Sequence, residues 1–133
     1  MTKEGYTSNE RIKEESDFLR GNISDLLHDG SITHFPSEEE FLLKFHGITQ
    51  QDNRDERLIR KKNGQERNWL FMLRLRLPGG RMTPSQWLAA ETLSDQFGNG
   101  TLKLTTRQAI QIHGVVKQDL KQTMKDIHHA AIT

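Results

Sequence analysis

The chain is organised around one stretch, LKLTTRQAIQIHG at residues 102–114, in which two short runs alternate between apolar and polar residues. Such alternation is typical of half-buried β-strands. If Thr105–Gln108 is a tight connection, the two runs form a hairpin whose core face carries Leu102, Leu104, Ile110 and Ile112. The opposite face then carries no acidic residue, and its polar members are Lys103, Gln111 and His113, with Arg107 at the turn. We expect this face to bind an anion.

A second strand is predicted at Trp69–Leu77, where FMLRLRL (71–77) places Arg74 and Arg76 on one face. Neighbours on one face of a strand are roughly 6.6 Å apart, so two guanidinium groups can hold one extended anion. Arginine offers a planar fork that matches carboxylate or phosphate. The composition alone leaves a second interpretation open, in which both arginines are simply the hydrated outer face of an amphipathic strand.

Several motifs, taken together, resemble the siroheme-dependent sulfite and nitrite reductases. The siroheme-binding segment of that family is similar to LTTRQ (104–108) followed by QIHG (111–114), and its preceding strand and turn to MLRLRLPGG (72–80). Its N-terminal part is similar to four further blocks: ERIK (10–13), SDFLRG (16–21), FHG (45–47) and QQD with RD (50–55). The blocks occur in the family's order from about Asn9 onward, and they are most similar to the N-terminal part of the haemoprotein (beta subunit) of assimilatory sulfite reductase.

The resemblance implies a cofactor clasp and a substrate-binding residue. Siroheme would be held through its rim carboxylates by Lys103, Thr105, Arg107, Gln111 and His113. Arg74 would face the substrate side of the iron as the catalytic residue that binds sulfite. The family also carries a four-iron four-sulfur cluster on cysteines; this chain has no cysteine, so the cluster ligands are expected beyond Thr133. No metal ligand is assigned within the chain, and His128 and His129 are interpreted as a surface pair.

The predicted function is therefore that of an N-terminal fragment of a sulfite reductase, an oxidoreductase that reduces sulfite to sulfide in sulfur assimilation and cysteine biosynthesis. We expect the chain to be inactive alone, because the cluster and part of the pocket would belong to the remainder of the same polypeptide. The electron donor is either an NADPH-linked flavoprotein or ferredoxin. Two alternatives stay open: a nitrite reductase of the same family, and a non-catalytic module that binds a tetrapyrrole.

Charge and hydropathy limit the other classes of function. The 133 residues carry 19 basic and 18 acidic side chains, but residues 71–133 have 8 basic against 4 acidic. The near-neutral total argues against a nucleic-acid or membrane partner, and the basic excess coincides with the two predicted anion-binding strands. The polar segment Gln50–Asn68 mixes both signs and lacks interleaved aromatic residues for base stacking. No apolar run approaches the roughly 20 residues that span a bilayer, and the N-terminus lacks an apolar signal core, so a cytoplasmic protein is expected.

The expected fold is α+β, with a helical and extended segment at residues 1–68 and a truncated ferredoxin-like half-domain at 69–133. In the first part, a helix begins near Ser8 or Asn9, a short helix follows Gly21, and residues 41–45 form a buried strand. By the resemblance, Gln50–Asn68 is an extended arm without a core of its own. In the second part, the expected order is strand, helix, strand, strand, helix. Thr83 and Pro84 begin the first helix of this part, and Asp119 caps the second.

Overall fold

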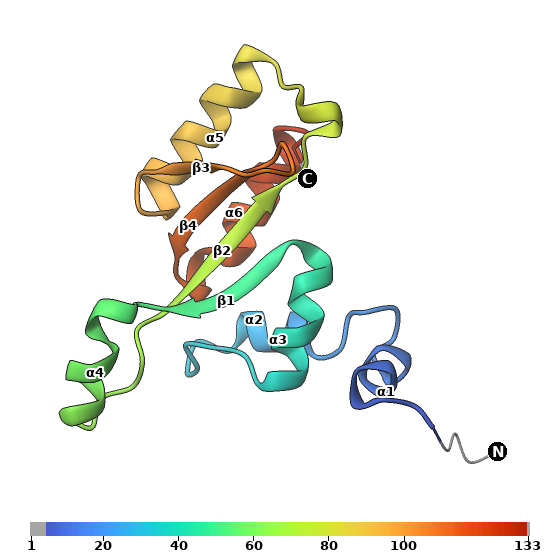
Figure 1. The fold of residues 1–133 in the computed structure, drawn as a ribbon, viewed down its shortest axis with the longest axis vertical. Helices are drawn as coiled ribbons and strands as arrows, with labels where there is room; N and C mark the ends of the chain where they lie inside the picture. Colours follow the sequence, from blue (N-terminus) through green and yellow to red (C-terminus); the bar gives the residue numbers. More distant parts are fainter. Residues whose placement is uncertain (1–4, 133) are drawn as a thin grey trace.

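The structure is a computed structural model that describes residues 5–132, and it is an α+β fold built on one antiparallel sheet (Figure 1). The four strands lie in the order β1-β2-β4-β3. Their bounds are β1 Ile48–Asp52, β2 Trp69–Leu75, β3 Leu102–Leu104 and β4 Ile110–Val115. The helices are α1 Ser8–Glu15, α2 Ile23–His28, α3 Ser37–Leu43, α4 Arg54–Lys62, α5 Pro84–Phe97 and α6 Lys117–His129, with short 3₁₀ turns η1 Lys44–His46 and η2 Pro78–Gly80.

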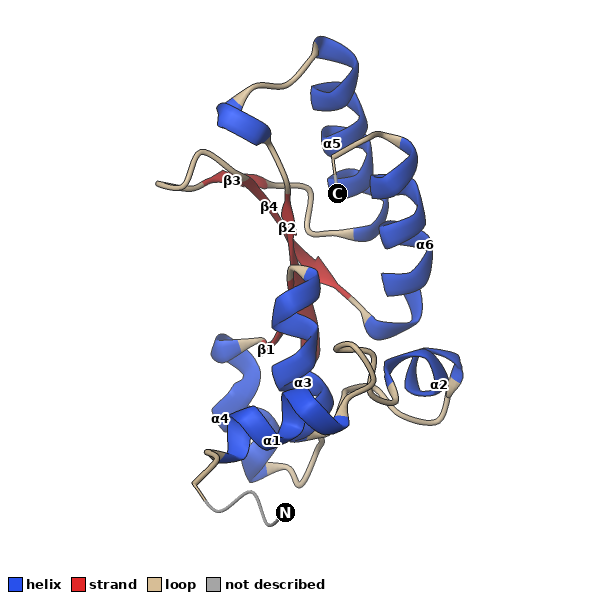
Figure 2. Cartoon of the chain, turned by 90° about the vertical axis from the view of Figure 1, so that its right-hand side faces the viewer, coloured by secondary structure: helices blue, strands red, loops and turns tan. Residues whose placement is uncertain are grey.

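The second half of the chain follows the predicted order strand, helix, strand, strand, helix. Helices α5 and α6 cover one face of the sheet, and the opposite face of β2, β4 and β3 carries neither of them (Figure 2). The covered face holds the core, whose strand members are fully buried: Phe71, Leu73, Leu75, Ile110, Ile112 and Val115. The fold class expected from the sequence is confirmed.

Local sequence signals explain the start and end of α5. The Thr83 hydroxyl accepts the backbone N–H of Gln86, while the Gln86 side chain accepts the N–H of Thr83 at 2.8 Å, which is a capping box. Proline at the first helical position needs no hydrogen-bond acceptor. The helix ends at Phe97, and Gly98 follows because its α-carbon lies against β4; a Cβ there would be 2.7 Å from the carbonyl oxygen of His113.

The first half differs from the prediction in two places. Residues 41–45, expected to be a buried strand, form the end of α3 and most of η1. Helix α3 begins at Ser37 with Glu38–Glu40 in its first turn, where acidic side chains favour the positive end of the helix dipole. The segment expected to be an extended arm contains the end of β1 and all of α4. Strand β1 pairs with β2 along its whole length, from Ile48 opposite Leu73 to Asp52 opposite Trp69.

Three smaller predictions also need correction. The cap of α1 is Thr7 rather than Ser8 or Asn9, since Thr7 forms a capping box with Glu10. Helix α6 begins at Lys117 with Val116 as its N-cap, so Asp119 lies inside the first turn. Leu104 is 75% exposed although its partner Ile110 is buried, because β3 is the short edge strand of the sheet.

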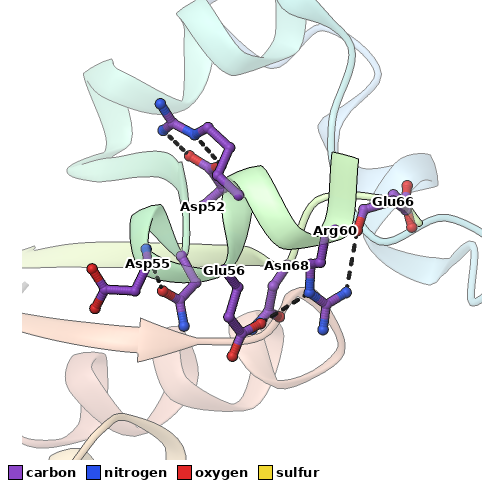
Figure 3. Close-up of polar contacts among 8 residues, drawn as sticks. Asp52, Asp55, Glu56, Arg60, Glu66 and Asn68 are labelled. Carbon is purple, nitrogen blue, oxygen red and sulfur yellow. Dashed lines mark hydrogen bonds and ion pairs between the residues drawn. The ribbon is translucent and has the colours of Figure 1, made fainter. Parts of the chain in front are cut away.

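Helix α4 is attached mainly by polar contacts, which Figure 3 shows. Arg57 pairs with Asp52 at the end of β1, and Arg60 donates to Glu56 at 2.9 Å and to the carbonyl of Glu66 at 3.1 Å. The first of these pairs lowers the pKa of Asp52 through the hydrogen bond from Arg57. Arg57 and Arg60 are therefore already paired with carboxylates of the protein.

Candidate anion-binding site

A row of polar side chains crosses the uncovered face of the sheet. Arg74 of β2 is paired in register with Gln111 of β4, and Gln111 is paired with Lys103 of β3. Directly opposed residues of antiparallel strands project from the same face. Leu73 and Leu75, on either side of Arg74, are buried on the helix-covered face, so this row projects from the opposite one. The predicted hairpin is confirmed, and so is the predicted alternation in β4, whereas Leu104 of β3 is exposed.

At one end of this row lies a hollow of about 740 Å³, here called the basic hollow. Its charged and titratable lining residues are Lys44, His46, Arg74, Arg76 and Arg107, and no acidic residue lines it. Within residues 5–132, the side chains of Lys44 and of the three arginines form no hydrogen bond or ion pair. One wall is apolar and includes Leu75, Leu77 and Ile127. Cations beside a wall of low dielectric attract an anion more strongly than the same cations in open water.

Two glycine contacts bring the parts of the basic hollow together. The N–H of Arg74 donates to the carbonyl of Gly47 at 2.8 Å, and Gly47 has φ +77°, with space for a Cβ limited by the Arg74 carbonyl at 3.2 Å. This contact places η1, with Lys44 and His46, directly beside β2. At the other side, a Cβ on Gly80 would lie 2.9 Å from that of Gln108. The turn after β2 thus abuts the hairpin tip that carries Arg107.

The hairpin tip is held by its own backbone and by Thr105. The N–H of Thr105 donates to the carbonyl of Ala109 at 2.9 Å, and that of Gln108 donates to the carbonyl of Thr105 at 3.0 Å. The Thr105 hydroxyl oxygen accepts the N–H of Ala109 at 3.3 Å. The geometry therefore engages Thr105 in shaping the turn that presents Arg107.

Two further predicted site residues, Lys103 and His113, line a second hollow of about 560 Å³. It is lined by Lys103 and His113 together with residues from β1 and α4: Gln50, Gln51, Asp52, Arg54 and Arg57. His113 Nε2 donates to the side-chain oxygen of Gln111 at 3.1 Å. Burial, and then the charge of Lys103, lower the pKa of His113, so its neutral form is favoured. Gln111 stands between the two hollows, paired with Arg74 on one side and Lys103 on the other.

The structure therefore places the predicted residues in two neighbouring groups rather than one cluster. Arg74 and Arg107 share the basic hollow, and Lys103 and His113 share the second hollow. Sequence reasoning did not include Lys44, His46 and Arg54 among the site residues. The motifs FHG and QQD with RD contained the signal, but they were used only for the resemblance, and no site role was predicted for their side chains.

Over residues 5–132, no group of three His, Cys, Asp or Glu side chains is arranged to hold a metal ion. No helix in the same range is both long and apolar enough to cross a membrane. The donor set of the two hollows, with guanidinium, ammonium, amide and imidazole groups from the sheet and from the elements beside it, suits a rigid ligand with several carboxylates.

The chain is thus an α+β protein with basic side chains on the sheet face that helices α5 and α6 leave uncovered. The nitrite/sulfite reductase ferredoxin-like half domain matches residues 63–130, and the chain belongs to this family. Similar proteins include the beta subunit of NADPH sulfite reductase of Saccharomyces cerevisiae, 56% identical over 124 residues. The NADPH sulfite reductase hemoprotein beta-component of Bacillus subtilis is 47% identical over 123 residues.

The chain is much shorter than these relatives. The alignment covers 91% of the chain and 8% of the yeast protein, and 92% of the chain and 22% of the Bacillus subtilis protein. A similar fold is found in the structure of the Mycobacterium tuberculosis NirA protein, with a TM-score of 0.71 at 15% identity. That likeness covers 93% of this chain and 24% of the other, and it shows the fold alone.

Proposed function

We propose that this chain is the N-terminal part of a siroheme- and iron–sulfur-dependent sulfite reductase, and that its sheet face supplies part of the cofactor and substrate pocket. The observation that carries the proposal is the acid-free basic hollow of a family half-domain, which Arg74, Arg76 and Arg107 line where the end of β2, the hairpin tip and η1 meet. The same proposal includes a division of the chain into an N-terminal segment, residues 1–68, and the ferredoxin-like half-domain, residues 69–133. The relatives that share about half of their aligned residues with this chain are named as sulfite reductases, which favours sulfite over nitrite as the substrate. The same names include NADPH, which favours an NADPH-linked flavoprotein over ferredoxin as the electron donor.

In this proposal the chain's residues divide into two tasks. Arg107, Lys103, Gln111 and His113 bind the rim carboxylates of siroheme, and Thr105 shapes the turn that carries Arg107. Burying carboxylates is costly unless each one receives a partner, and these side chains offer both charge and hydrogen-bond donors. The four-iron four-sulfur cluster would depend on residues outside this chain, since the sequence contains no cysteine.

Arg74 has the second task, which is to bind the oxyanion. When bound, siroheme supplies the redox chemistry. The guanidinium of Arg74 lowers the free energy of gathering a negative oxyanion in the pocket and stabilises the charge that builds up on its oxygens. Because Arg74 has no acidic partner among residues 5–132, it needs no rearrangement to receive the oxyanion. Arg76 lies in the same hollow and strengthens the local positive potential.

The experiment is Arg74→Ala in the complete enzyme to which the proposal assigns this chain. We expect sulfite reduction per bound siroheme to fall roughly ten- to a thousand-fold, as for loss of one preorganised charged donor, with siroheme content nearly unchanged. Arg81→Ala is the matched control, since Arg81 carries the same charge but is exposed outside both hollows. Normal turnover in an Arg74→Ala enzyme with its full siroheme content would refute the role in oxyanion binding and would favour the interpretation of Arg74 as a hydrated residue on the outer face of the strand. We also expect no sulfite turnover by the 133-residue chain alone with a chemical reductant.

A further inference from the structure

The loop between α1 and α2 has an unusual backbone. Asp17, Phe18 and Leu19 adopt left-handed φ values of 50°, 57° and 67°, although none of them is glycine. Each such residue costs about 1–2 kcal/mol relative to the right-handed conformation, so three in a row need local compensation. Buried Ser16 provides it: its hydroxyl oxygen accepts the N–H of Leu19 at 3.0 Å and donates to the carbonyl of Lys13 at 2.5 Å. We call residues 17–19 the left-handed turn.

The left-handed turn is fixed against the element that carries His46. Gly21, which follows it, packs so closely on α3 that a Cβ would be 2.7 Å from Leu42 Cδ1. The carbonyl of Leu19 accepts a hydrogen bond from His46 Nε2 at 2.8 Å. Since a carbonyl oxygen can only accept, Nε2 must carry the hydrogen of this bond, and Nδ1 is the other ring nitrogen.

His46 lines the basic hollow, and its Nδ1 has no protein partner within residues 5–132. The elements that adjoin it carry charges of both signs: Glu10, Arg11, Lys13, Glu14 and Glu15 of α1, Asp17 and Arg20 of the loop after it, Glu38, Glu39 and Glu40 of α3, and Lys44, in addition to the three arginines of the hollow. We propose that His46 is an anion-binding group of the basic hollow, contacting a carboxylate or oxyanion through Nδ1, and that the left-handed turn positions it. This inference rests on the proposed function.

The chemistry gives the proposal a distinct signature. A neutral imidazole with hydrogen on Nε2 has only a lone pair at Nδ1, which cannot donate to an anion. An anion at Nδ1 favours the protonated form, in which both nitrogens donate, and therefore raises the pKa of His46. Binding of the anion then takes up a proton from solvent, and affinity for the anion is higher at pH 6 than at pH 8.

The test uses the 133-residue chain and uroporphyrin, a metal-free tetrapyrrole with carboxylates on its rim. Affinity is measured by fluorescence titration at pH 6 and pH 8, and the pKa of His46 by nitrogen-15 NMR with and without the probe. His46→Gln keeps an N–H that can reach the Leu19 carbonyl but removes Nδ1. We expect it to bind roughly tenfold more weakly at pH 6, the low end for a hydrogen bond to a charged group, with a smaller difference at pH 8. His128→Gln, at an exposed residue of α6, is the control.

Ser16→Ala tests the positioning role, because it removes the hydrogen bond to Leu19 while leaving every group of the hollow in place. We expect affinity to fall at pH 6 although His46 is present. If wild type fails to bind the probe, the inference on His46 is wrong, while the proposed function is decided separately by the Arg74→Ala experiment in the complete enzyme. If wild type binds and neither His46→Gln affinity nor the pKa of His46 changes, the inference on His46 is wrong and the proposed function stands. If only Ser16→Ala behaves as wild type, the turn has no positioning role. Should His46→Gln fail to fold, the wild-type comparison decides: the inference on His46 holds if the probe raises the pKa of His46 and is wrong if it does not.

Discussion

Replacing Arg107 with alanine tests whether this residue belongs to the proposed cofactor clasp or to the proposed substrate site. Arg107 sits at the hairpin tip with no protein partner among residues 5–132, on the rim of a hollow with one apolar wall. A fully hydrated ion pair would contribute about 0.2–1 kcal/mol, whereas a charge-assisted hydrogen bond shielded from water contributes about 1.5–3 kcal/mol. With the apolar wall on one side and the flat ligand on the other, we expect about 2 kcal/mol, or roughly a thirty-fold loss of siroheme affinity.

The assay is siroheme absorbance per polypeptide during titration, with activity per bound siroheme measured in the complete enzyme. Arg81→Ala removes the same charge; at about 10 Å in water a unit charge contributes only about 0.4 kcal/mol before screening, so we expect at most a twofold change. Arg107→Lys should recover only part of the affinity, because lysine keeps the charge but not the fork. Equal affinities for the Arg107→Ala and Arg81→Ala proteins would refute the clasp. Full occupancy with low activity per siroheme would assign Arg107 to the chemistry instead.

Two further predictions concern stability. Burial, and then the charge of Lys103, lower the pKa of His113 from the ordinary 6.5, so the unfolded chain binds a proton at this side chain more tightly than the folded chain does. The free energy of unfolding should therefore fall as pH drops through about 6.5. Urea unfolding from pH 8 to pH 5 measures this fall, which should be smaller in His113→Gln. In the same assay, Gly98→Ala should lower the free energy of unfolding by about 1–3 kcal/mol, because its Cβ would lie 2.7 Å from the carbonyl oxygen of His113. The control is Gly30→Ala, whose Cβ would have no atom within 4 Å, and its free energy of unfolding should lie within about 0.5 kcal/mol of wild type. Equal stabilities of the two alanine variants would contradict the packing argument.

The elements that the sequence predicted well are those specified by nearby residues. The hairpin follows from strict alternation around a short connection, and the start of α5 follows from Thr83, Pro84 and Gln86. Each of these signals acts within a few residues, where capping and turn geometry decide the backbone. The same reasoning gave α2 after Gly21, although not the left-handed turn that precedes Gly21.

The predictions that were wrong involve contacts between distant residues or ambiguous periodicity. FLLKF at residues 41–45 is too short to distinguish a buried strand from the end of a helix, and the acidic first turn of α3 decides the outcome. Strand β1 was missed because its sequence is polar after Ile48. Its Gln50 is nevertheless buried, since its side chain bonds both the N–H and the carbonyl of Phe35, at 2.7 and 3.2 Å. A contact between residues 15 positions apart leaves no period in the sequence.

Arg74, Arg107 and Lys103 of the candidate site could be predicted from the sequence, but their positions relative to one another could not, because the register between the strands determines which side chains are neighbours. Arg74 and Lys103 lie on β2 and β3, on either side of Gln111 of β4. With adjacent strands about 4.8 Å apart, the α-carbons of Arg74 and Lys103 are separated by about 10 Å. A small oxyanion held by Arg74 is therefore out of contact with the Lys103 backbone position, whereas a rigid frame with carboxylates around its rim can engage both hollows at once. This separation is the physical reason for proposing that Lys103 engages a different part of a large ligand from Arg74, and Gln111, between them, is the side chain that a ligand spanning both hollows must cross.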